Sequence, residues 1–293
     1  MRSWRGAKDR ALARAHTRFA SVRERLEGYS PPPGVSAWVY EFLLFGVKQA
    51  WACLFGGLML ALLLGTYLAY PANAPVYRYD FITLAAVCIQ LTMLGLRLES
   101  WEEAKVIAAF HLVGTVMEFF KTHLGSWEYP EPAMLRIAGV PLFTGFMYAA
   151  VGSYIARVWR IFDFRFPGYP QPALAGAVAV AIYVNFFSHH WLPDARWLLL
   201  AAMTILFWQT RVVFRVWRDD RSMPLLLGWL LVAVFIWVAE NIATLSQAWV
   251  YPSQRNGWQL VSPAKLIAWY LLMYISFVLV ASVHRLRMRS PKA

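Results

Sequence analysis

Long apolar runs constrain the fold of this chain more than any other feature of its sequence. A membrane-crossing helix needs roughly 20 apolar residues, and eight runs approach this length, at about 49–69, 80–97, 106–124, 140–159, 172–190, 197–216, 224–246 and 265–284. A transmembrane barrel would instead show alternating segments of about 10 residues. The sequence therefore predicts an all-α polytopic membrane protein with about eight transmembrane helices.

Composition and charge agree with this prediction. Hydrophobic residues make up 59% of the chain and charged residues 15%, which is more apolar side chain than a soluble domain buries. Most Lys and Arg residues fall on one side of the predicted helices, which the positive-inside rule makes cytoplasmic, and an even number of spans leaves both termini cytoplasmic. The net charge of +12 then reflects topology and contacts with anionic lipids on the cytoplasmic side, and we expect no nucleic-acid partner.

Sliding the chain against itself reveals an internal repeat, which is a standard search in sequence interpretation. At an offset of 122 residues without a gap, uncommon residue types coincide: Glu118 with Glu240, Trp127 with Trp249, Tyr129 with Tyr251, Pro141 with Pro263, and Tyr148 with Tyr270. The alternative is that two membrane helices with aromatic interfacial belts simply look alike. Belts do not fix spacing residue by residue, so we favour a duplication.

The repeat suggests a division of the chain. Residues 1–40 form a cytoplasmic basic arm, 41–161 a first four-helix repeat, and 162–293 a second four-helix repeat with a short basic tail. Each unit holds an even number of helices, so the two should have parallel orientations. The two "W-x-Y-P" loops, at Trp127 and Trp249, should then face each other on the outer side.

Charged residues inside the third run are the first candidates for a site. On a helix, His111, Glu118 and Thr122 share one face, and Lys121 lies one step round from Glu118. Charged groups at this depth cost roughly 2.5–3.5 kcal/mol on insertion scales and often mark functional sites. A Glu118–Lys121 ion pair that closes the helix end is the alternative for the lysine. The second half keeps one carboxylate, Glu240.

No metal or cofactor site is evident in the sequence. The segment "SHHWLPDAR" places His189, His190 and Asp194 in a predicted outer loop, where a metal would need further ligands. We expect this loop to be solvated. The chain has two cysteines without a partner motif, so we expect no metal and no cofactor.

Four segments carry a resemblance to a known family: "FGVKQAWACLFGGLML", "YRYDF", "FHLVGTVMEFFKTHLGSWEYPEP" and "GVPLFTGFMYAAVGSYIARVWR". Together they resemble the bacterial membrane family catalogued as domain of unknown function 817, over nearly the whole chain after residue 40. The resemblance implies the bacterial cytoplasmic (inner) membrane, and it implies no activity.

A more distant resemblance implies a chemistry. The pattern "E-x-x-K-T-x-x-G-S-W-x-Y", followed by "G-V-P-L", is similar to membrane carotenoid 1,2-hydratases, and the tandem halves are similar to membrane lycopene cyclases. Where the cyclases carry an acidic motif, this chain has "PLFTG" at Pro141 and "PAKLI" at Pro263. The resemblance to the hydratases rests on Glu118, Thr122, Gly125, Trp127, Tyr129, Gly139 and Pro141.

The implied reaction is acid/base chemistry (hydration, cyclisation or isomerisation) on an isoprenoid or another apolar lipid. Such a reaction begins with protonation of an alkene by a buried acid. In this interpretation the catalytic residues are Glu118, Glu240, His111 and Lys121. Aromatic faces such as those of Trp127, Tyr129, Trp249 and Tyr251 stabilise the cation that follows. The predicted substrate-binding residues are these four together with Thr122 and Tyr148.

Two other classes of function stay open from the sequence. One is a small-solute or proton-coupled transporter or channel, with Glu118, Glu240, Lys121 and His111 along a path between the two repeats. The other is a membrane scaffold, and self-association into an oligomer is compatible with the sequence. The expected partners are membrane lipids and either an apolar lipid or a small solute.

Overall fold

The computed structural model of this protein describes residues 28–289, apart from 30, 97 and 100, and it is mostly helical. The helices are α2 (Val35–Ala52), α3 (Leu54–Ala69), α4 (Arg78–Gly95), α5 (Trp101–His123), α6 (Thr144–Ile161), α7 (Pro172–Ser188), α8 (Arg196–Phe207), α9 (Leu225–Leu245) and α10 (Ala264–Arg289), with a 3-10 turn η1 (Pro252–Gln254). The short strands β1 (Arg136–Ile137) and β2 (Val140–Pro141), and the longer β3 (Arg211–Arg215) and β4 (Asp220–Pro224), form two antiparallel pairs. Most of the predicted basic arm, residues 1–27, lies outside the described residues.

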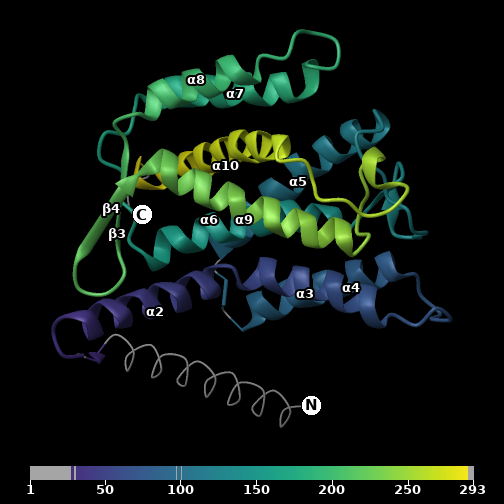
Figure 1. The fold of residues 1–293 in the computed structure, drawn as a ribbon, viewed down its shortest axis with the longest axis horizontal. Coiled ribbons are helices and arrows are strands. Elements are labelled where there is room, and N and C mark those ends of the chain that lie inside the picture. The colour runs from purple at the N-terminus through teal and green to yellow at the C-terminus, as the bar shows by residue number, and fades with distance from the viewer. Residues whose placement is uncertain (1–27, 30, 97, 100, 290–293) are drawn as a thin grey trace.

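The helices lie in layers (Figure 1). Helices α5, α6, α9 and α10 form the middle of the molecule, with α7 and α8 on one side and α2, α3 and α4 on the other. The β3–β4 hairpin lies at one end, and the two loops with the "W-x-Y-P" sequences lie at the opposite end. The candidate site is therefore built at the loop end of the bundle.

Glycines allow α5 and α6 to pack closely. A Cβ atom added at Gly145 would lie 2.3 Å from Cε1 of His111, and one added at Gly114 would lie 2.5 Å from Cγ of Tyr148. Neither position has room for a larger residue, because both neighbours are ring atoms rather than flexible chain ends. Small residues at such crossings are typical of membrane helix pairs. This close contact places Tyr148 of α6 beside the polar face of α5.

Helices α9 and α10 form a second pair at the offset predicted from the sequence. Shifted by 122 residues, α5 would cover 223–245, and α9 covers Leu225–Leu245. In the same way α6 would cover 266–283, which lies within α10. This agreement concerns two helices of each unit. The proposed four-helix repeats and their boundaries stay predictions.

Fewer helices than expected are able to cross a membrane. By length and composition, α9 and the Ala264–Ser282 part of α10 qualify. A third span is reached if α2 and α3, which are bent by 67° at a short break, count as one. Within the part of the chain that the structure describes, eight transmembrane helices are not supported.

Length and charge explain most of this correction. Helices α7 and α8 have 17 and 12 residues, at or below the lower limit for a crossing. Helix α5 carries Glu118 and Lys121, and α6 carries Arg157 and Arg160. Apolar runs that were expected to be spans are thus shorter, bent or interrupted by charge.

The predicted run 197–216 contains the clearest error. Its helix ends at Phe207, and Arg211–Arg215 is a strand that pairs with Asp220–Pro224. The reason is the alternation in this segment, since Val212 and Phe214 are buried while Arg211 and Arg215 are exposed. A period of two is typical of a strand with one buried face.

Candidate functional site

Glu118 is the centre of a buried hydrogen-bonded cluster. Its side chain lies on α5 and is only 4% exposed. Oε2 accepts hydrogen bonds from the indole N–H of Trp127 (2.9 Å) and from the hydroxyl of Tyr129. Oε1 accepts one from the hydroxyl of Tyr148 (2.8 Å). A carboxylate is an acceptor only, so three donors from the loop and from α6 match its needs.

Glu240 on α9 is the centre of a second cluster of the same kind. It is 3% exposed, and its Oε1 accepts a hydrogen bond from the hydroxyl of Tyr251. Its Oε2 accepts one from the indole N–H of Trp269 at 2.6 Å. Tyr251 thus repeats the role of Tyr129, and the tryptophan that donates is Trp269 of α10. Trp249, predicted as a substrate-binding residue, packs against an apolar cluster.

The same turn ends both helices and starts both loops. After α5, the amides of Gly125 and Ser126 donate to the carbonyls of Thr122 and Lys121. After α9, residues 247 and 248 donate to the carbonyls of 244 and 243 in the same way. Gly125 has a φ of 67° and its counterpart, a glutamine, has a φ of 53°. This left-handed turn is a common way for a helix to end, and it sends each loop back across its glutamate.

The two loops contact each other directly. Glu128 and Val250 form an isolated antiparallel bridge, and the rings of Trp127 and Tyr251 meet edge to face at 6.3 Å. The Arg255 guanidinium also donates two hydrogen bonds to the carboxylate of Glu128, at 2.9 and 2.7 Å. The expectation that the "W-x-Y-P" loops face each other agrees with these contacts. The two glutamate clusters are thereby neighbours.

Burial keeps the tyrosine hydroxyls protonated. Tyr129 and Tyr251 lie in the loops, and burial raises the pKa of each well above its ordinary value. The negative charges of Glu118 and Glu240 beside them raise the pKa of the respective hydroxyl further. Both tyrosines therefore remain hydrogen-bond donors to the carboxylates over the whole neutral range.

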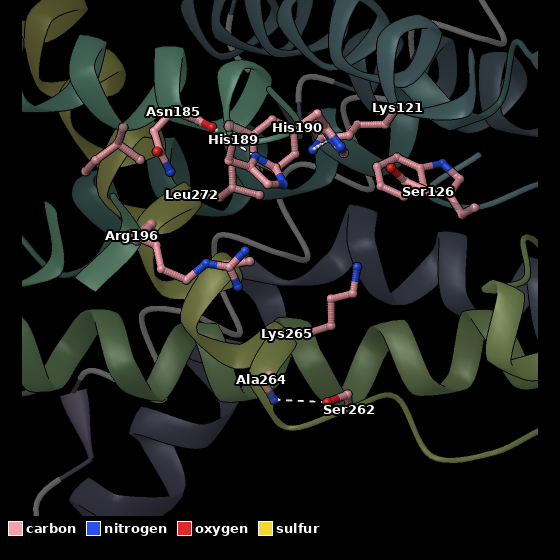
Figure 2. A pocket seen from close by; sticks show the side chains of 15 residues that line it. Lys121, Ser126, Asn185, His189, His190, Arg196, Ser262, Ala264, Lys265 and Leu272 are labelled. Carbon is pink, nitrogen blue, oxygen red and sulfur yellow. Dashed lines mark hydrogen bonds between the residues drawn. The ribbon is translucent and has the colours of Figure 1, made fainter. Parts of the chain in front are cut away.

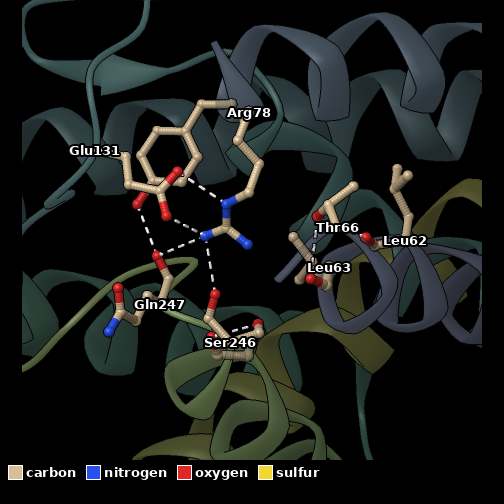
Figure 3. Close-up of polar contacts among 9 residues, drawn as sticks. Leu62, Leu63, Thr66, Arg78, Glu131, Ser246 and Gln247 are labelled. Carbon is tan, nitrogen blue, oxygen red and sulfur yellow. Dashed lines mark hydrogen bonds and ion pairs between the residues drawn. The ribbon is translucent and has the colours of Figure 1, made fainter. Parts of the chain in front are cut away.

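Arg78 joins the loops to the start of α4, as Figure 3 shows. Its guanidinium pairs with the carboxylate of Glu131, with nitrogen–oxygen distances of 2.6 and 2.8 Å, and donates to the carbonyls of Ser246 (2.9 Å) and Gln247 (3.2 Å). Nearby, the carboxylate of Asp80 accepts the backbone N–H groups of residues 134 and 135. The segment "YRYDF" therefore fixes the loop end of the molecule, a role that sequence reasoning did not assign to it.

Two predicted site residues lie apart from the carboxylates. The ring of His111 packs against Gly145 and the ring of Phe146, 5.0 Å between centroids, and it makes no hydrogen bond to Glu118 among the described residues. The hydroxyl oxygen of Thr122 is buried without a hydrogen-bond partner in the described part of the chain. Neither residue contributes to the two clusters.

Lys121 does not form the ion pair with Glu118 that the sequence allowed. Its Nζ lies 2.8 Å from Nε2 of His190 and 4.2 Å from the ring centroid of Phe186. It faces a pocket of about 270 Å³ between α5, α7 and the start of α10. Figure 2 shows the polar lining of this pocket, which includes Arg196 and Lys265.

Lys121 was predicted as a catalytic residue, whereas the pocket that it faces was not predicted. His189 and His190 were expected in a solvated loop, and His190 is exposed. Both also line the pocket, and their ring centroids lie 4.2 Å apart. One feature of the sequence indicated this pocket. At the offset of 122 residues, the charged Lys265 corresponds to the apolar Phe143. No group of three or more metal-ligating side chains occurs among the described residues.

Comparison with known proteins identifies the family but no activity. The family model described as "Protein of unknown function (DUF817)" matches residues 41–277. A relative described as "Uncharacterized protein YoaT", from Bacillus subtilis (strain 168), is 42% identical over 253 residues, which cover 86% of this chain and 95% of the relative. No solved structure matches the chain. The resemblance to carotenoid hydratases stays a prediction. With most of its length matched, the chain belongs to the DUF817 family.

Proposed function

We propose that this protein is an integral membrane protein that carries a small solute between its two halves, coupled to proton binding at Glu118 and Glu240. The exposed surface supports residence in a membrane. Large apolar side chains project outward from several helices, among them Phe235 (76% exposed), Ile205 (78%) and Leu112 (68%). Soluble proteins rarely expose such extensive apolar surface, whereas lipid covers it without cost.

The observation that carries the proposal is the bonding of the two buried glutamates. Each is held by Tyr and Trp donors, which are neutral, and no salt bridge to either carboxylate occurs among the described residues. A buried carboxylate that no cation pairs can be neutralised by a proton instead. Ionisable residues in membrane proteins that face the interior commonly serve as proton relays. Two such groups in contact through their loops are suited to this role.

The pocket lies beside both clusters. Trp127 lines the pocket and donates to Glu118. Lys265 also lines it, with its Nζ 4.3 Å from the ring centroid of Tyr251, which donates to Glu240. A change of charge at either glutamate would therefore act on the pocket wall through one intervening side chain. This is the geometry that coupling between proton and solute requires.

Lipid chemistry is the rival proposal for the same residues. Alkene protonation by Glu118 creates a carbocation, and the cationic side chains of Lys121, Arg196 and Lys265 would repel that intermediate in the pocket. Glu118 also does not line the pocket, so its carboxyl group would not meet an alkene bound there. Both points favour transport over chemistry on an isoprenoid. No contact in the described residues specifically favours a scaffold.

Topology belongs to the same proposal. The hairpin that carries Arg211, Arg215 and Arg221 lies at the end of the bundle opposite the "W-x-Y-P" loops (Figure 1). The positive-inside rule supports a proposed orientation in the bacterial inner membrane, with the hairpin on the cytoplasmic side and the loops outside.

The test is transport by the purified full chain in proteoliposomes that contain a pH-sensitive dye. A pulse of water-soluble bacterial metabolites is added outside, and internal acidification is recorded together with accumulated solutes by mass spectrometry. We expect acidification with wild-type protein and its loss in Glu118→Gln and Glu240→Gln. Asp219→Asn, which also replaces a carboxylate by an amide but at an exposed position in the turn of the β3–β4 hairpin, is the matched control. Equal acidification in all three variants, or no accumulation with wild-type protein, would refute proton-coupled transport.

A further inference from the structure

The pocket beside the two clusters is basic on one wall and apolar on the other. It lies where α5 and α7 end and where α8 and α10 begin. None of its lining residues is acidic. Three cationic residues and two histidines are among them: Lys121, Arg196, Lys265, His189 and His190. In Figure 2 the nitrogens of Lys121, Arg196 and Lys265 point into the same space. Ile182, Leu271 and Leu272 line the apolar part.

The three cations are not neutralised on the side that faces the pocket. Lys121 is only 4% exposed, and its partners are an imidazole and an aromatic ring. The ammonium of Lys265 makes no hydrogen bond to another described residue and lies over a tyrosine ring. Arg196 uses Nε to pair with Asp194, which leaves its two Nη groups for the pocket. Of the three, Lys121 is a buried cation with no ion-pair partner among the described residues, which is costly, and an anion in the pocket would offset this cost.

The corresponding positions in the other unit show that the fold does not require these charges. At the offset of 122 residues, Lys121 corresponds to Ala243 and Lys265 to Phe143. Both of these residues are fully buried and belong to one apolar cluster. The same helix ends therefore pack stably with Ala and Phe. The lysines open a charged pocket at a place where the other unit has a filled core.

We infer that this pocket binds an oxyanion group, a phosphate or a carboxylate, carried on a small organic molecule or on a lipid. Lysine and arginine bind such groups through short charge-assisted hydrogen bonds. The apolar wall accommodates a hydrocarbon part, and a volume of about 270 Å³ lies near the small end of the range for ligand sites, roughly 300–1,000 Å³. This inference names the class of solute for the proposed transport. It rests on that function only where it concerns movement of the solute, because binding to the pocket is measured separately.

Binding is tested on the full-length protein in phosphatidylcholine nanodiscs by the midpoint of thermal unfolding. Inorganic phosphate and succinate are titrated separately, and a third sample uses nanodiscs that also contain phosphatidylglycerol. A ligand that binds the folded state raises the midpoint in a saturable way. We expect stabilisation by at least one of the three probes. A response to phosphate or succinate identifies a soluble anion, and a response to phosphatidylglycerol alone identifies a lipid headgroup.

The decisive variant is Lys121→Ala/Lys265→Phe, which copies the residues of the other unit and is therefore expected to fold. We expect its apparent affinity to fall at least ~10-fold, from the loss of charge-assisted hydrogen bonds. Lys265→Gln, a milder change, provides a second readout. Lys105→Ala is the control, because it removes a positive charge about 24 Å away on α5, 16 residues at 1.5 Å each.

The result separates the two proposals. Unchanged affinity in the lysine variants, or no saturable response to any probe, would overturn the anion site. Saturable binding that is lost in these variants, combined with no solute uptake in proteoliposomes, would leave the anion site standing and would refute only the transport function.

Discussion

Glu128 and Val250 exchange two backbone hydrogen bonds, with nitrogen–oxygen distances of 3.0 and 2.9 Å. These residues are 122 positions apart, the same spacing that relates Glu118 to Glu240 and Tyr129 to Tyr251. Equivalent positions of the two loops therefore meet each other. Such a self-pairing is what an approximate two-fold axis between the loops produces, as at the symmetric interface of a dimer.

The turns that launch the loops should respond oppositely to substitution. Gly125 has a left-handed φ of 67°, so Gly125→Ala should lower the free energy of unfolding by about 1 kcal/mol. Gln247 adopts a φ of 53° although it has a side chain, so Gln247→Gly relieves backbone strain in the folded state. Glycine also makes the unfolded chain more flexible, which offsets part of this gain, so the free energy of unfolding should stay the same or rise slightly. Thermal unfolding in detergent measures both. A loss of stability in Gln247→Gly as large as that in Gly125→Ala would contradict this account.

Tyr148 and Tyr270 occupy equivalent positions but hold different partners. The hydroxyl of Tyr148 donates to the carboxylate of Glu118, whereas that of Tyr270 donates to the carbonyl of Leu226 at 3.0 Å. Hydrogen bonds to charged groups are worth about 1.5–3 kcal/mol and those to neutral groups about 0.5–1.5 kcal/mol. Tyr148→Phe should therefore reduce the unfolding free energy more than Tyr270→Phe, measured by thermal unfolding in the same detergent. Equal losses would mean that the bond to Glu118 has no special strength.

Some parts of the site were predictable from sequence. The spacing of 122 residues paired Glu118 with Glu240 and predicted that the two loops face each other, and the bridge between Glu128 and Val250 agrees with that expectation. Trp127, Tyr129 and Tyr148 were assigned to the site for their chemistry, and all three donate to Glu118.

Other parts depended on tertiary contacts that no local pattern encodes. His111 was grouped with Glu118 by helical periodicity, but the glycine at position 145 lets α6 pack against its ring. Lys121 was expected near Glu118, and it instead faces α7, whose position the sequence did not give. Trp269 was not assigned to the site, and it donates to Glu240 because α10 packs against α9.

The span count failed for a related reason. Hydropathy records how apolar a run is, and it does not record whether the backbone stays helical. The break between α2 and α3 and strand β3 both fall inside runs that were expected to continue as helix. In the hairpin, the alternation of Arg211 to Arg215 contained the correct signal, and the length of the apolar run outweighed it.

Anion binding should strengthen as the pH falls. Burial, with the positive charge of Lys121 and neighbouring His189, lowers the pKa of His190 below its ordinary value of 6.5. His190 is therefore neutral at pH 7. A bound anion favours the protonated form of His190 and therefore raises the pKa of this histidine. By linkage, the affinity for the anion rises as the pH falls from the pKa of His190 in the bound protein to its lower pKa in the free protein.

The phosphate or phosphatidylglycerol titration, repeated between pH 5.5 and 8 in ~0.5-unit steps, checks this expectation. The groups that face His190 are Lys121 on α5 and His189 on its own loop, with Phe120 and Trp191 packed against the ring. His190→Gln should flatten the pH dependence, and His189→Gln should change it less. An affinity that falls on acidification would contradict the assignment.

Arg157 should be the most sensitive charged residue of the fold. Its side chain is fully buried on α6, donates to the carbonyls of Trp51 (3.1 Å) and Leu98 (3.1 Å), and pairs with Glu99 at 3.2 Å. It thereby connects the end of α2, just before the bend, to the segment between α4 and α5. Removing one partner of a buried ion pair costs about 3–5 kcal/mol, because the other charge is left unpaired.

Arg157→Ala should therefore abolish or severely reduce folded protein, and Arg157→Lys should restore it only in part, since a lysine cannot reach three acceptors with one planar group. Arg160→Ala is the matched control one turn further along α6, where the side chain is 55% exposed and pairs with Glu103. Only Glu103 is buried in this pair, whereas both partners are buried in the pair of Arg157, so the loss of stability should be smaller in Arg160→Ala. The yield of monodisperse protein by size-exclusion chromatography and its unfolding midpoint report the difference. Similar behaviour of the two alanine variants would show that Arg157 does not hold the bend in place.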